Sequence, residues 1–174
     1  MSVVAGKPQQ DEHAPYYSLY IDQIASDDIV SVLSSQLTDT LATIRTIPEE
    51  KGVYRYAEGK WSIKELIGHI IDTERVFAYR ALRFARNDAK PLEGFDQDPY
   101  ILNANFDSCS LADLAAEFEH LRKANVYMFA NLAPEAWSRT GLANDNKISV
   151  RALAYILAGH EKHHIDILQK RYLA

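Results

Sequence analysis

Two histidines near the end of the chain have the spacing of metal ligands on one helix. His160 and His164 are four residues apart, so their side chains share one helix face and lie about 6 Å apart along the axis. The same face carries the apolar residues Leu153, Leu157, Ile167 and Leu168. Burying two imidazoles costs free energy unless their ring nitrogens find partners, and a divalent metal ion is one such partner. Hydrogen bonds to core polar groups or to water are the alternative.

A third histidine occupies the same kind of position earlier in the chain. His69 lies in an apolar stripe that includes Leu66, Ile70 and Val76. If the two segments are helices that pack antiparallel, His69 lies at the same level along the helix axes as His160 and His164. Three histidines with a free coordination position are typical of a catalytic metal site, not of a closed structural one. A lone core histidine is more often structural, so a plain bundle with buried histidines remains an alternative.

The other three histidines have less favourable positions for binding a metal. We expect His13, in a polar opening segment, and His120, beside two glutamates, to be solvated. His163 lies one residue off the stripe, so we expect it to be exposed or to neighbour the ligands.

Several carboxylates are candidate general bases, although surface exposure or helix capping would also explain each of them. They are Asp72, Glu74, Asp96 and Asp98. Glu74 is five residues after His69, about 140° around a helix, and should not share the metal face. Thr73 is better placed to share the metal face.

Four long segments with one-sided apolar stripes predict an all-α fold. They cover roughly residues 27–47, 62–86, 110–132 and 149–172, with a short helical turn near residues 17–24. Ser62 and Glu65 have the spacing of a capping box, which marks a helix start. Helices of this kind bury their stripes best as a four-helix bundle. Strand-like alternation is confined to residues 53–57, and we find no convincing β-hairpin.

The connection between the second and third helices is unusually long. It runs over residues 87–109 and contains PLEGFDQDPYILNANFD, whereas most connections have about 4–6 residues. We expect a non-helical crossover that either packs across the bundle end or forms one wall of a ligand pocket. A crossover of this length can join parallel helices.

Composition limits the class of protein. The 174 residues fit one domain, expected over residues 14–174 after a loosely ordered leader at 1–13. A net charge of −5 argues against nucleic-acid binding. We expect no membrane span and no secretory signal. The single cysteine, Cys109, excludes an internal disulfide and a cysteine-based metal site, and these features together predict a cytoplasmic protein.

Four stretches, in order, resemble the DinB-like (YfiT-like) superfamily of metal-dependent enzymes, in particular its DinB_2 type. They are APYYSLYIDQI, WSIKELIGHIIDTERVFAYRALRFAR, the crossover PLEGFDQDPYILNANFD, and LAYILAGHEKHHIDIL, so the resemblance covers the chain from about Ala14 onward. The metal triad of the family, one histidine from the second helix and two from the last, falls on His69, His160 and His164.

The resemblance implies a four-helix bundle, often dimeric, that binds zinc, nickel or another divalent cation such as iron or manganese. Some members are transferases that use low-molecular-weight thiols such as bacillithiol, mycothiol or glutathione, and many others are regarded as hydrolases. We therefore expect the three histidines to converge inside the bundle around an ion with open coordination positions. The ion would activate a water or a cosubstrate thiolate against a small molecule. A non-catalytic stress-response module that binds a metal or small molecule is the alternative.

Overall fold

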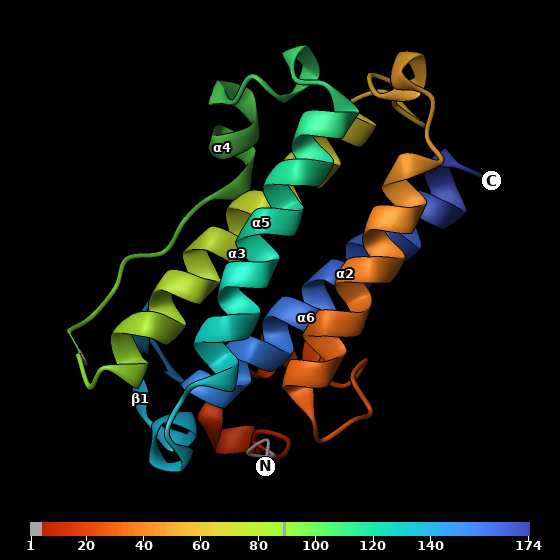
Figure 1. Cartoon of the computed structure of the whole chain (residues 1–174). Coiled ribbons are helices and arrows are strands. Elements are labelled where there is room, and N and C mark those ends of the chain that lie inside the picture. The colour runs from red at the N-terminus through yellow and green to blue at the C-terminus, as the bar shows by residue number, and fades with distance from the viewer. Residues whose placement is uncertain (1–4, 89) are drawn as a thin grey trace.

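The computed structural model describes residues 5–88 and 90–174 and contains the predicted bundle of four long helices (Figure 1). They are α2 (Ile29–Arg45), α3 (Ile63–Ala85), α5 (Leu111–Ala130) and α6 (Val150–Ile167). A π-helical turn, Leu168–Tyr172, continues α6, and a short helix, α1 (Ser18–Ile21), precedes α2. The all-α prediction is confirmed. Within the described ranges, no helix is both long enough and apolar enough to cross a membrane.

Polar side chains begin the long helices, as the sequence predicts for α3. The Ser62 hydroxyl accepts a hydrogen bond from the Glu65 backbone N–H, and the Glu65 carboxylate accepts one from the Ser62 backbone N–H. Ser110 and Ser149 accept equivalent bonds at the starts of α5 and α6. Each cap satisfies an N–H group that has no partner within its helix, which fixes where the helix starts.

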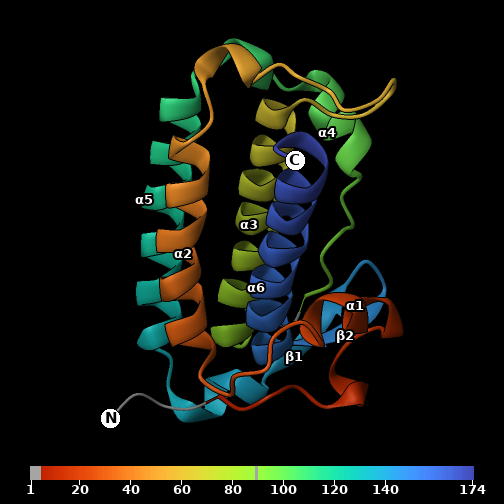
Figure 2. The ribbon, with the colours of Figure 1, turned by 90° about the vertical axis from the view of Figure 1, so that its right-hand side faces the viewer.

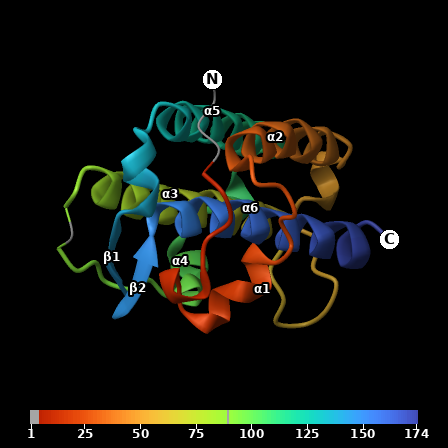
Figure 3. The same ribbon diagram turned by 90° about the horizontal axis from the view of Figure 1, so that it is seen from below.

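The helices form two layers, and a third group of short elements covers one of them. Seen from below, α2 and α5 make one layer, α3 and α6 the next, and α1, α4 and the β-strands lie against the outer side of the second layer (Figure 3). The crossover runs back along the bundle, so α3 and α5 point the same way while α3 and α6 are antiparallel (Figures 1 and 2). The long connection therefore joins parallel helices, as its length allows.

The crossover is not free of helix, which corrects the sequence-based prediction. It contains α4 (Gln97–Asn103) and a 3₁₀ turn at Phe106–Ser108. The Asp96 side chain accepts a hydrogen bond from the Asp98 backbone N–H and thereby caps α4. Asp96 in this segment is therefore a helix-start signal that the sequence analysis did not use.

A β-hairpin is present, so the prediction that there is none was wrong. Strands β1 (Thr140–Ala143) and β2 (Asn146–Ser149) pair antiparallel. Asn144 and Asp145 form the turn, both with positive φ, at 50° and 59°. Two successive residues in the left-handed backbone conformation give a turn that matches the right-handed twist of the strands. Residues 53–57, where alternation was noted, form no strand.

One glycine allows α1 to approach α6 closely. A Cβ atom at Gly159 would lie 2.1 Å from the backbone oxygen of Tyr20, so no larger residue fits without moving the backbone. The contact places Tyr20 beside His160, with ring centroids 5.4 Å apart. Gly159 therefore determines how near the N-terminal segment lies to the histidines.

A charged cluster fills the centre of the bundle and joins all four long helices. Arg122 on α5 is fully buried and donates to both carboxylate oxygens of Glu74 on α3, at 2.7 and 2.5 Å, and to Glu161 on α6, at 2.6 Å. Thr40 on α2 donates to Glu161 at 2.7 Å, and Asn125 donates to Glu74 at 3.0 Å. Buried charges require such partners.

The part of the expected leader at residues 1–4 lies outside the described residues. In the remainder, residues Gln10–Glu12 form a 3₁₀ turn, and the buried carboxylate of Glu12 accepts hydrogen bonds from Arg151 and Ser149 at the start of α6. Burial alone would raise the pKa of Glu12, but the bonds from Arg151 and Ser149 outweigh burial and lower it below 4.5. The contact ties the N-terminal segment to the helix that carries two of the histidines.

Replacing Glu12 with glutamine should lower the free energy of unfolding at pH 7 by about 1.5–3 kcal/mol, the usual contribution of a hydrogen bond to a charged group. Because the folded-state pKa is lowered, the wild-type contribution is present above about pH 4.5 and is lost as the pH falls through the folded value. Urea unfolding of both proteins at pH 7 and pH 3 measures this. A difference of equal size at the two pH values would contradict the assignment.

Candidate metal centre

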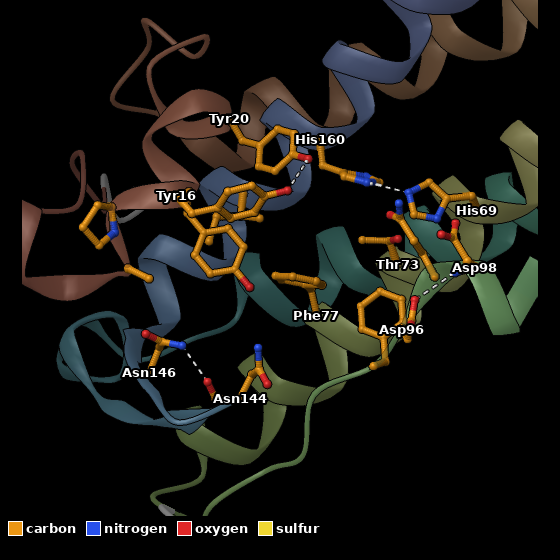
Figure 4. Close-up of a pocket in the computed structure, with 16 residues that line it drawn as sticks. Tyr16, Tyr20, His69, Thr73, Phe77, Asp96, Asp98, Asn144, Asn146 and His160 are labelled. Carbon is orange, nitrogen blue, oxygen red and sulfur yellow. Dashed lines mark hydrogen bonds between the residues drawn. The ribbon is translucent and has the colours of Figure 1, made fainter. Parts of the chain in front are cut away.

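Three histidines from two helices converge on one point. His69 comes from α3, and His160 and His164 come from successive turns of α6. One ring nitrogen from each lies within 4.8 Å of the others. The Nε2 atoms of His69 and His160 are 2.9 Å apart, and Figure 4 shows the two rings pointing toward each other. The structure therefore brings together all three residues that the sequence selected.

The triad lies beside the bundle core and not at its centre, which corrects one expectation. The cavity that His69 and His160 face is lined by none of the described residues of α2 or α5. The centre is occupied by Arg122 and its two glutamates. Helices α3 and α6 each bury two faces, one toward α2 and α5 and one beneath α1 and the crossover (Figure 3). The apolar pattern in the sequence did not show which of the two buried faces carries the histidines.

Burial keeps the three imidazoles neutral. His69 is 2% exposed and His160 7%, while His164 is half-buried. Burial lowers the pKa of His69 to about 4. It lowers the pKa of His164 to about 3, with smaller effects from His69 and His163. For His160, burial followed by the neighbouring histidines moves the pKa well below 6.5. At neutral pH each ring keeps a nitrogen lone pair, which is the form that binds metals.

The donors fit a divalent cation. Nδ1 of His164 is buried without a hydrogen-bond partner among the described residues, and burying a polar atom in this way costs free energy. His69 and His160 contact each other through their Nε2 atoms. Three imidazole nitrogens suit zinc, nickel, iron or copper. Held there, an ion would take the place of the hydrogen bond between His69 and His160 and of the partner that His164 lacks.

Aromatic side chains hold the rings in place. Trp61 lies against His69, with ring centroids 4.8 Å apart. Tyr20 meets His160 and His163 edge-on, at 5.4 and 5.6 Å. His163 is half-buried beside the triad, in agreement with a neighbouring role. This packing fixes the side-chain conformations of the histidines before a metal binds. Metal binding then costs less conformational entropy.

A cavity of about 630 Å³ opens beside the triad (Figure 4). Its walls come from the N-terminal segment, α3, the crossover and the hairpin, and they include Tyr16, Tyr17, Tyr20, Thr73, Phe77, Phe95, Asn144 and Asn146. This volume suits a small organic molecule. Of the two roles considered for the crossover, the structure shows that it forms a wall of this cavity.

The candidate bases have different positions. Glu74 points into the bundle and is bound to Arg122 and Asn125, so it is unavailable to the cavity. Asp96 lines the cavity, but its carboxylate also caps α4. Asp98 lines the cavity together with His69 and His160, and its side chain makes no hydrogen bond or ion pair with the described residues. Asp72 lies near Arg75, at 3.7 Å. Asp98 is thus the carboxylate best placed for chemistry.

Of three remaining positions, one differs from the sequence analysis and two agree with it. His13 was expected to be solvated, but it is buried, and its Nδ1 contacts the Ala14 carbonyl at 2.9 Å. His120 is exposed, as predicted. Thr73 lines the cavity, as its helix position suggested, and its hydroxyl has no partner among the described residues.

The tyrosines of the N-terminal segment and the hairpin asparagines were not recognised as cavity residues. The aromatic run at residues 16–20 was one available signal. The turn-forming pair Asn144 and Asp145, which precedes Asn146, was the other.

The structure is thus a helical bundle in which three neutral histidines, two buried and one half-buried, lie beside a cavity. The chain belongs to the DinB superfamily, whose family model matches residues 33–168. A candidate metal-dependent hydrolase of Oceanobacillus iheyensis is 26% identical over 125 residues, which is 71% of each chain.

Two solved structures from Bacillus subtilis share this architecture. YfiT, described as a probable metal-dependent hydrolase with an unusual four-helix bundle topology, matches with a TM-score of 0.72 at 15% identity, covering 85% of this chain and 89% of YfiT. A DinB-like protein, YjoA, matches with a TM-score of 0.58 at 26% identity, covering 80% and 85%. At 15% identity, the YfiT match shows the fold alone.

Proposed function

We propose that this protein is a metal-dependent enzyme that holds a divalent cation on His69, His160 and His164 and acts on a small molecule in the adjoining cavity. The observation that carries the proposal is the convergence of three neutral imidazoles within 4.8 Å at the wall of a 630 Å³ cavity. The hydrolase description of the Oceanobacillus relative supports it. Zinc and nickel are the preferred ions, with iron or manganese as alternatives.

A cation at this position would lower the pKa of a coordinated water or thiol and so supply a nucleophile at neutral pH. The protein side chains position the cation ligands, exclude water and accept a proton. Trp61 and Tyr20 orient the imidazoles, and the aromatic cavity walls exclude water from the substrate. Asp98, at the cavity wall without a hydrogen-bonded or ionic partner among the described residues, is our candidate for the group that accepts the proton of the nucleophile.

The reaction is either hydrolysis or transfer to a low-molecular-weight thiol. The chain itself supplies no thiol to the site, because Cys109, its single cysteine, lies before α5 and lines neither cavity beside the triad. A transferase would therefore take its thiol from a second substrate. Retention of the cavity for binding alone, without turnover, is the competing function.

Asp98→Asn should lower kcat by about a hundredfold to ten-thousandfold, the usual contribution of a positioned base, with metal content unchanged. The assay incubates metal-loaded protein with esters, amides and alkylating electrophiles, with and without small thiols, and follows acid release and thiol loss. The matched control is Asp22→Asn, because Asp22 is exposed and lies outside the cavity.

Metal-dependent thiol loss would identify a transferase, and acid release without thiol a hydrolase. Metal-loaded protein that turns over nothing in the panel would favour the binding module. Equal kcat values for the Asp98 and Asp22 variants would reject Asp98 as the base.

A further inference from the structure

A second cavity reaches the triad. His69 and His160 line the larger cavity, whereas His164 lines another of about 350 Å³. Among the described residues, Asp98 alone belongs to both linings. The three histidines and Asp98 therefore lie where two separate cavities meet, and the larger cavity does not account for all of the space beside the site.

The walls of the smaller cavity are aromatic and ordered by contacts of their own. Tyr172, on the π turn after α6, donates a hydrogen bond from its hydroxyl to the Trp61 carbonyl at 2.8 Å. Tyr56 meets Tyr172 edge-on, with ring centroids 4.8 Å apart. Trp61 also contacts His69, as described above. These contacts join the segment before α3 to the end of α6, so the cavity is built by packed side chains.

One lysine in this wall makes no ion pair with any described residue. Lys60 is exposed and lines the smaller cavity but not the larger one. Within the described chain it makes no ion pair or side-chain hydrogen bond, whereas Arg55 binds Glu65 and Asp107, and Lys64 binds Glu49. Lys60 is thus available to a ligand, while the neighbouring cations already have partners.

We propose that the smaller cavity is a second substrate subsite, which binds a small carboxylate with an apolar or aromatic body. Lys60 anchors the carboxylate, the walls of Tyr56, Trp61 and Tyr172 pack on the body, and the opposite end reaches the triad. The negative charge of Asp98, where the two cavities meet, repels the carboxylate from the histidines and so fixes the orientation of the ligand.

The role of this subsite in a reaction rests on the proposed function. Two subsites at one metal centre imply two organic reactants. Hydrolysis needs one organic substrate and water, whereas group transfer needs a donor and an acceptor. The paired cavities therefore favour group transfer over hydrolysis. Binding in the smaller cavity does not itself require a metal.

The test uses the ¹⁵N-labelled, metal-free protein and follows the two tryptophan indole N–H signals by NMR. The probes are phenylacetate and its uncharged analogue phenylacetamide. Phenylacetate should shift the Trp61 signal saturably and leave that of Trp137 unchanged, because Trp137 is buried against Phe129. The amide should bind about tenfold more weakly. The side-chain amide signals of Asn144 and Asn146 report on the larger cavity and should not move.

Lys60→Gln should weaken phenylacetate binding about tenfold, as expected for one lost charge contact worth about 1.4 kcal/mol. The matched control is Lys51→Gln, an exposed lysine outside this cavity on the same connection between α2 and α3. Both lysines are at the surface, so both variants should fold.

Equal affinity for the two probes, equal effects of the two lysine substitutions, or no saturable shift of Trp61 would each overturn the proposal. Shifts confined to the asparagine signals would place the ligand in the larger cavity and also overturn it. Because these measurements use metal-free protein, they remain informative if the triad binds no metal, and the two proposals can fail separately.

Discussion

Replacing His160 with alanine should weaken zinc or nickel binding by two to three orders of magnitude. Structural zinc sites with four ligands have apparent binding free energies of about 10–16 kcal/mol, which is roughly 2.5–4 kcal/mol for each ligand. His160 faces both of the other candidate ligands, with ring centroids 4.8 Å from His69 and 4.4 Å from His164. Competition with a chromophoric chelator measures the affinity, and elemental analysis of the purified protein gives the occupancy.

Two controls separate metal binding from a general effect of losing a histidine. His163→Ala, on the same helix, should leave the affinity nearly unchanged, and so should His120→Ala on the exposed face of α5. A metal at one hundred times its Kd should stabilise the wild type by about 2.7 kcal/mol and raise its melting temperature. The His160 variant should gain much less at the same concentration.

The metal prediction would be wrong if the carefully purified wild type held almost no metal and bound none on titration. It would also be wrong if His160→Ala and His163→Ala had the same affinity. Circular dichroism of the metal-free proteins is the necessary check on folding. A folded His160 variant with reduced affinity would exclude unfolding as the cause.

Helix periodicity predicted the bundle and placed the three histidines on apolar faces, because both depend on residues that recur along one face. It left a purely structural role for the histidines open, and the resemblance to the DinB-like superfamily implied the metal triad. The capping box at Ser62 was equally local and is present in the structure. The hairpin was missed because each strand has only four residues, too few for alternation to be recognised. Its signal was the Asn144–Asp145 turn, where both residues adopt left-handed conformations.

The position of the triad relative to the bundle could not be predicted from the stripe alone. A helix that buries two faces carries apolar residues on both, and the sequence does not say which partner covers which face. From Val150 to Glu161, all but one residue of α6 is buried. The cover over the histidines comes from α1, far away in sequence, and depends on the close approach of Tyr20 to Gly159. Such long-range contacts have no local signature.

The central charge cluster was missed for a different reason. Arg122 lies beside Lys123 in the sequence, and charged residues are rarely buried without a partner. Its position four residues after Phe118 places it on the buried stripe of α5. Glu74 and Glu161 occupy comparable positions, four residues after Ile70 and Leu157. Three charges on three apolar stripes are a signal, but only once the stripes are known to face one another.

Replacing Arg122 with methionine should lower the free energy of unfolding by about 3–5 kcal/mol, the usual cost of breaking a buried ion pair from one side. Arg122 has no exposed side-chain surface, and Glu74 and Glu161 are 2% and 1% exposed. Methionine fills much of the volume but leaves two carboxylates buried without their cation. Urea or guanidinium unfolding of the metal-free proteins measures the change.

The comparison with a surface pair tests whether burial is the cause. Arg75 binds Glu117 at 2.6 Å, but both side chains are substantially exposed, at 47% and 38%. Arg75→Met should therefore cost no more than about 1 kcal/mol. If Arg122→Met lowered the free energy of unfolding by no more than Arg75→Met, the charges of the cluster would have to be compensated in some other way.

A triple variant separates the cost of unpaired charge from the loss of packing. Combining Arg122→Met with Glu74→Leu and Glu161→Leu removes every charge of the cluster and should recover most of the lost stability, because apolar replacements of buried ion pairs are often neutral or stabilising. The cluster links the two helices that carry the histidines, since Glu161 follows His160 directly on α6 and Glu74 lies on α3 with His69. The triple variant should therefore fold stably but bind metal more weakly, if the charged contacts fix the register of α3 against α6. Unchanged metal affinity in a stable triple variant would show that the cluster stabilises the bundle without positioning the site.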